Sequence, residues 1–93
     1  MRHVLVSSED DGLIEGLRGL LPPEAVLFSA RGVDDTLERF ARSARVDVVI
    51  TDDPEIAAAI REEVPGSLPV VVLPEGASPQ EAVRFLEEAL PGR

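Results

Sequence analysis

The sequence contains no cysteine, lysine, asparagine, tryptophan or tyrosine. The absence of cysteine excludes disulfides, thiolate nucleophiles and cysteine-ligated zinc. Three phenylalanines are the only Phe, Trp or Tyr residues, too few for a surface on which single-stranded nucleic acid could stack. The net charge of −9 repels phosphate backbones. No apolar run approaches the roughly 20 residues that cross a bilayer. We therefore expect neither nucleic-acid nor membrane binding.

The basic residues are all arginine, and glutamine occurs once, at Gln80. Few thermolabile amides are typical of thermophilic proteins, while a GC-rich coding bias would also explain the use of arginine alone. The chain does not open on a basic stretch followed by an apolar run, so we expect a cytoplasmic protein without a signal peptide. Its 93 residues predict a single domain, 1–93.

Four apolar runs alternate with four amphipathic segments along the chain. The predicted strands are residues 3–7, 25–29, 46–51 and 69–73. Apolar residues spaced three and four positions apart predict a helix after each strand. These inner-face residues are Leu13, Ile14, Leu17, Leu20 and Leu21; Val33, Leu37, Phe40, Ala41 and Ala44; Ile56, Ala57, Ile60 and Val64; and Ala82, Phe85, Leu86, Ala89 and Leu90.

Helix boundaries have their own local signals. Ser8 or Asp10 can cap the first helix, and Asp53 followed by Pro54 is a favourable start for the third. Ser78-Pro-Gln-Glu81 is a capping box with proline in the first turn. Proline pairs or Pro-Gly follow the first, third and last helices, at 22–23, 65–66 and 91–92. The resulting βαβαβαβα order predicts a parallel sheet with helices on both faces, a three-layer α/β domain.

Several segments, in order, resemble the receiver domain of response regulators. The resemblance is carried by Val4-Leu5-Val6-Ser7-Ser8-Glu9-Asp10, the helix at 13–21, Asp47-Val48-Val49-Ile50-Thr51-Asp52, and Leu73-Pro74 before Ser78-Pro79-Gln80-Glu81. It implies a flavodoxin-like sheet with strand order 2-1-3-4. It also implies that Asp52 corresponds to the phospho-acceptor aspartate of that family.

The departures from the receiver pattern concern the whole site. Receivers have five βα units, whereas this chain has room for four, and its fourth strand could correspond to the family's fourth or fifth. Ser7-Ser8 replaces the paired acids after the first strand, Leu73 replaces the lysine, and Pro74 stands where the family has serine or threonine. We therefore predict a pseudo-receiver that is not phosphorylated.

The carboxyl ends of parallel strands are the usual ligand-binding edge of such sheets. Here they would bring Ser7, Ser8, Glu9 and Asp10 to face Thr51, Asp52 and Asp53 in an edge pocket. Glu9, Asp10 and Asp52 could offer oxygen ligands to Mg²⁺; the alternative is that these acids cap helices. Arg31 is the nearest candidate cation, and His3 lies at the opposite end of its strand. No cofactor other than this Mg²⁺ is predicted.

Two functions follow as expectations. The first is a non-catalytic, receiver-like domain acting in protein–protein interaction or regulation; the alternative is a domain that binds Mg²⁺ or a small ligand at its acidic edge. The polar inventory is too thin for an enzyme with a positioned acid, base and nucleophile. Because a four-stranded sheet leaves residues Val70, Val71, Val72 and Leu73 at an edge, we also predict a homodimer that buries this strand or the neighbouring helices.

Overall fold

The computed structural model describes residues 3–42, 46–63 and 68–89. Along these residues, strands and helices alternate strictly. The strands are β1 (His3–Ser7), β2 (Val26–Ala30), β3 (Val48–Thr51) and β4 (Val70–Val72). The helices are α1 (Asp11–Leu20), α2 (Gly32–Arg42), α3 (Pro54–Glu63) and α4 (Pro79–Ala89). The sheet is entirely parallel in the order β2-β1-β3-β4. The predicted strand order 2-1-3-4 is confirmed.

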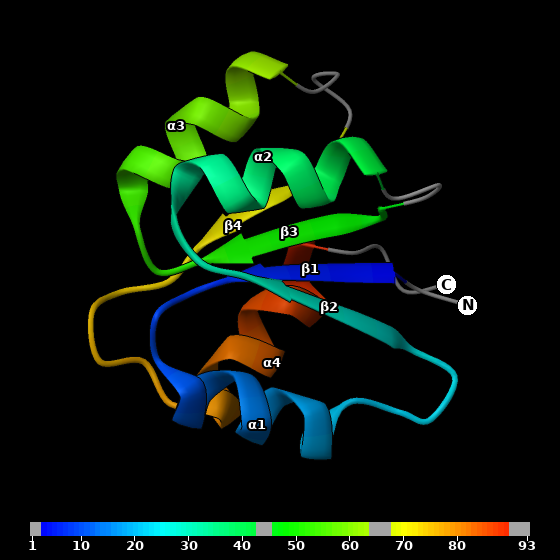
Figure 1. Cartoon of the computed structure of the whole chain (residues 1–93). Helices are drawn as coiled ribbons and strands as arrows, with labels where there is room; N and C mark the ends of the chain where they lie inside the picture. Colours follow the sequence, from blue (N-terminus) through cyan, green and yellow to red (C-terminus); the bar gives the residue numbers. More distant parts are fainter. Residues whose placement is uncertain (1–2, 43–45, 64–67, 90–93) are drawn as a thin grey trace.

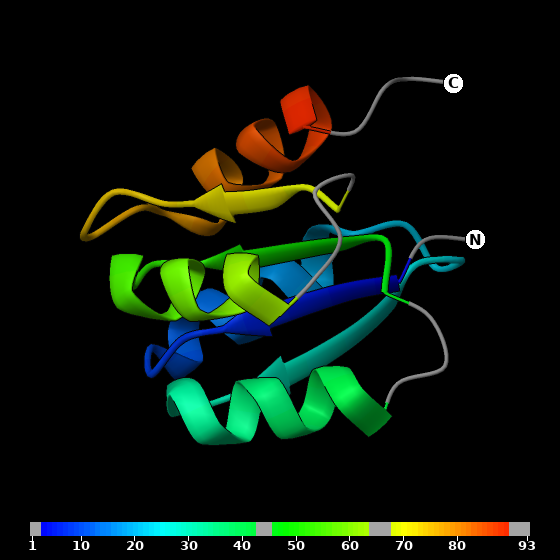
Figure 2. The ribbon, with the colours of Figure 1, turned by 90° about the horizontal axis from the view of Figure 1, so that it is seen from above.

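The sheet lies between two helical layers, with α1 and α4 on one face and α2 and α3 on the other (Figure 1). Successive side chains of a strand point to opposite faces, so Val4 and Val6 pack against α1 and α4 while Leu5 packs against α2 and α3. β1 and β3 are central, and β2 and β4 are the edges (Figure 2). The three-layer α/β prediction is therefore confirmed.

The predicted helix starts are confirmed by hydrogen bonds. Asp10 caps α1, with its Oδ1 accepting from the Leu13 N–H at 3.2 Å. Asp53 Oδ1 accepts from the Glu55 N–H at 2.9 Å at the start of α3. In the capping box of α4, the Glu81 N–H donates to Ser78 Oγ at 3.2 Å and the Ser78 N–H donates to Glu81 Oε1 at 3.1 Å. Short polar side chains thus satisfy N–H groups that no helical carbonyl can reach.

The ends of three strands differ from the prediction. Ala25 belongs to the turn after the proline pair, since its N–H donates to the Pro22 carbonyl at 3.0 Å, and β2 runs one residue further, to Ala30. β3 begins at Val48, and Asp47 just before it exchanges two hydrogen bonds with His3: the Asp47 N–H donates to the His3 carbonyl and the His3 N–H donates to Asp47 Oδ2. β4 is limited to Val70–Val72, although the flanking residues on either side still bond to β3.

Three predicted inner-face residues are exposed: Leu20 (46%), Phe85 (36%) and Ala41. Leu20 is the last residue of α1, and α2 buries Thr36 where periodicity favoured larger apolar residues. Phe85 lies on α4, whose buried residues are Ala82 and Leu86, and it belongs to neither core cluster. Ala44, Val64, Leu90 and the two Pro-Gly stops at 65–66 and 91–92 lie outside the described residues.

The first and last helices pack closely against each other. A Cβ built on Gly16 of α1 would lie 2.3 Å from Cγ of Pro79, the first residue of α4. Any larger residue at position 16 would therefore require α1 or Pro79 to shift. The longest helices described, α2 and α4, have eleven residues each, and no helix in the described ranges is long and apolar enough to cross a membrane.

Candidate functional site

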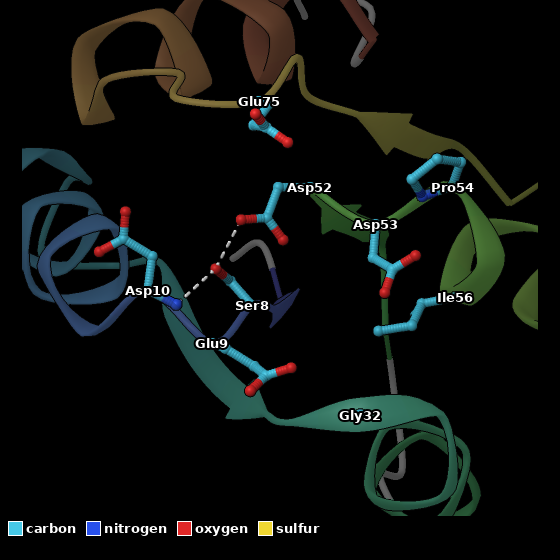
Figure 3. A pocket seen from close by; sticks show the side chains of 9 residues that line it. All are labelled: Ser8, Glu9, Asp10, Gly32, Asp52, Asp53, Pro54, Ile56 and Glu75. Carbon is cyan, nitrogen blue, oxygen red and sulfur yellow. Dashed lines mark hydrogen bonds between the residues drawn. The ribbon is translucent and has the colours of Figure 1, made fainter.

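A cleft of about 530 Å³ opens at the carboxyl ends of β1 and β3. The strand order reverses between these two strands, because β2 lies on one side of β1 and β3 on the other. Such a switch point is where open α/β sheets bind ligands. The lining consists of Ser8, Glu9, Asp10, Gly32, Asp52, Asp53, Pro54, Ile56 and Glu75 (Figure 3). The cleft is therefore where the sheet topology predicts one.

A short hydrogen-bond chain joins the two central strands across this cleft. The Asp10 N–H donates to Ser8 Oγ at 3.0 Å, and Ser8 Oγ donates to Asp52 Oδ2 at 2.9 Å (Figure 3). Ser8 is buried, with an exposed fraction of 2%. One oxygen of Asp52 is thus already bound by a neutral hydroxyl, and this bond couples the end of β3 to the start of α1.

The charge of the cleft is uniformly negative. Five of its nine lining residues are acidic: Glu9, Asp10, Asp52, Asp53 and Glu75. None of the nine is basic. Negative charges that lie within about a Debye length of one another make the electrostatic potential of a cleft more negative, which attracts cations. The cleft therefore favours positively charged groups over phosphate.

The candidate cation, Arg31, is engaged elsewhere. Its guanidinium pairs with Asp11 at the start of α1, and its backbone N–H donates to Asp35 Oδ2 at 2.9 Å. Its side chain is 59% exposed and does not line the cleft. Gly32, the first residue of α2, has φ +78°, a left-handed conformation that favours glycine. Gly32 brings backbone, without a side chain, to the lining of the cleft.

Two residues predicted for the edge pocket lie beneath it. Ser7 and Thr51 are both fully buried and absent from the lining. Thr36 Oγ1 donates to the Gly32 carbonyl at 2.6 Å, so Ser7 Oγ must donate the 2.6 Å hydrogen bond that joins Ser7 to Thr36. Thr51 Oγ1 accepts from the Asp53 N–H at 3.1 Å. These hydroxyls position the turns that carry the lining.

The three predicted metal ligands share the cleft. Glu9, Asp10 and Asp52 all line it. Asp10 caps α1 and Asp52 accepts from Ser8. In residues 3–42, 46–63 and 68–89, no group of three His, Cys, Asp or Glu side chains could hold a metal ion.

Leu73, the residue that the receiver resemblance aligns with a lysine, belongs to the core. Leu73 is 3% exposed and packs with α1 and α4 in the apolar layer. Its N–H donates to the Thr51 carbonyl at 2.7 Å, which fixes it beside β3. Leu73 therefore contributes packing in the structure and presents no group to the cleft.

Four lining residues were not predicted from the sequence. Pro54 and Ile56 come from the first turn of α3, and Gly32 from the first turn of α2. Glu75 follows β4 and was the most accessible to sequence reasoning, since the carboxyl end of every parallel strand reaches the same edge. His3 lies at the other end of β1, stacked on Phe28 with ring centroids 6.2 Å apart, and its backbone N–H donates to Asp47.

Comparison with known proteins gives no relative from which a role could be transferred. No protein-family model, no curated protein sequence and no solved structure matches the chain.

Proposed function

We propose that this chain is a non-catalytic, receiver-like domain of the cytoplasm, whose acidic cleft binds a basic side chain of a protein partner. The observation that carries the proposal is the state of Asp52. This residue stands at the switch point, where the receiver resemblance expects a phospho-acceptor, yet its oxygen accepts from Ser8 and none of the described residues that line its cleft is basic. The strand order that the resemblance implies is present, and the basic group that phosphoryl transfer uses is not among this lining.

Electrostatics supports the absence of phosphoryl transfer. A transferring phosphoryl group carries negative charge on its oxygens, and enzymes stabilise it with Lys, Arg or metal ions. The cleft instead presents four further carboxylates around Asp52. An acyl phosphate on Asp52 would have to form against that repulsion, so we expect Asp52 to remain unmodified.

Phosphorylation is tested directly by incubating the full chain with Mg²⁺ and a small phosphodonor and measuring its intact mass. We expect no added phosphoryl group in the wild type, with Asp52→Asn as the background control. A phosphoryl group found on Asp52 would overturn the proposal. Calorimetry with Mg²⁺ alone addresses the alternative: tight binding that Asp52→Ala abolishes would make the domain a metal-binding one.

The charge of the cleft indicates the chemistry of the partner. Glu9 and Glu75 are exposed on opposite sides of the cleft and belong to no described ion pair (Figure 3). A lysine or arginine side chain entering between them would gain charge-assisted hydrogen bonds. The apolar part of the floor, formed by Ile56 and Pro54, suits the aliphatic stem of such a side chain.

The partner proposal is tested by capture from the native host with two charge-matched variants. Glu9→Gln/Glu75→Gln neutralises the cleft, and Glu62→Gln/Glu63→Gln removes the same charge from an exposed turn of α3. We expect a protein retained by the wild type and by the α3 variant but lost, by about tenfold or more, from the cleft variant. Equal retention by all three chains contradicts a role for the cleft.

A further inference from the structure

We draw no further inference here: the strongest candidate, the apolar hollow between α1 and α4 that is lined by Val4, Leu20, Leu21, Val83 and Leu86, carries none because nothing in the structure shows what covers it.

Discussion

Replacement of Gly16 by alanine tests the packing of α1 against α4 most directly. In an open helical position this change would stabilise a protein by about 0.5–1 kcal/mol, because alanine loses less backbone entropy. At Gly16 the added Cβ would lie 2.3 Å from Cγ and 2.7 Å from Cβ of Pro79. Carbon atoms pack at about 3.5–4.0 Å, so the helices must separate by roughly 1 Å.

The magnitude follows from what can move. Pro79 is a rigid ring at the first position of α4, held by the Ser78–Glu81 capping box. Because the proline ring cannot rotate away, α1 and α4 must move apart to accommodate the added Cβ. Overpacking of this kind costs about 1–3 kcal/mol. After subtraction of the helical gain, we expect Gly16→Ala to lower the free energy of unfolding by about 0.5–2 kcal/mol.

Gly19→Ala is the matched control, because a Cβ at Gly19 meets no atom within 4 Å. We expect it to leave stability unchanged or to raise it by up to about 1 kcal/mol. Urea unfolding followed by far-ultraviolet circular dichroism suits a chain without tryptophan, and the m-value should be the same for both variants. Equal stabilisation by Gly16→Ala and Gly19→Ala would refute the close contact, as would a Gly16→Ala cost that is fully additive with that of Pro79→Ala.

Three further predictions concern the sheet edge and the core. Thr36→Val should lower the free energy of unfolding in urea by about 1–3 kcal/mol, because it leaves the buried Ser7 hydroxyl without its hydrogen-bond acceptor. The double variant Ser7→Ala/Thr36→Val should lose less stability than the sum of the two single variants. Asp53→Ala should cost about 0.5–2 kcal/mol by removing the cap of α3; an unchanged midpoint would show that the cap is dispensable. Leu17→Ala should cost about 2–5 kcal/mol because Leu17 is 1% exposed, whereas Leu20→Ala should change stability by less than about 1 kcal/mol.

The parts of the fold that were predictable from the sequence are those that depend on local signals. The capping box at Ser78 and the Asp53-Pro54 start act within one turn of helix, so the residues alone specify them. The strand order followed from the resemblance to receivers, and the arrangement of Ser8 and Asp52 at one edge followed from that order. The exposure of Phe85 was not predictable from periodicity, because its spacing is that of a buried residue.

The lining of the cleft shows the same division. Ser8, Glu9, Asp10, Asp52 and Asp53 were predicted because each directly follows a central strand. The division between lining and buried hydroxyls was not predictable, since it depends on side-chain direction: consecutive residues such as Ser7 and Ser8 point to different environments. The hydrogen bond from Ser8 to Asp52 and the ion pair between Arg31 and Asp11 also depend on distances that cannot be read from spacing along the chain.

The contact between Gly16 and Pro79 also has a consequence for how the chain folds. This contact joins α1 to α4. In addition, β1 can pair on its second side only after β3 has been synthesised. Contacts between segments so distant in sequence slow folding, because the intervening chain must be ordered before they form. During synthesis, the amino-terminal half of the domain would contain β1 paired only with β2, and α1 without its contact to α4. We therefore expect no stable folded fragment before α4 is present, and unfolding of residues 3–89 to occur in one cooperative step.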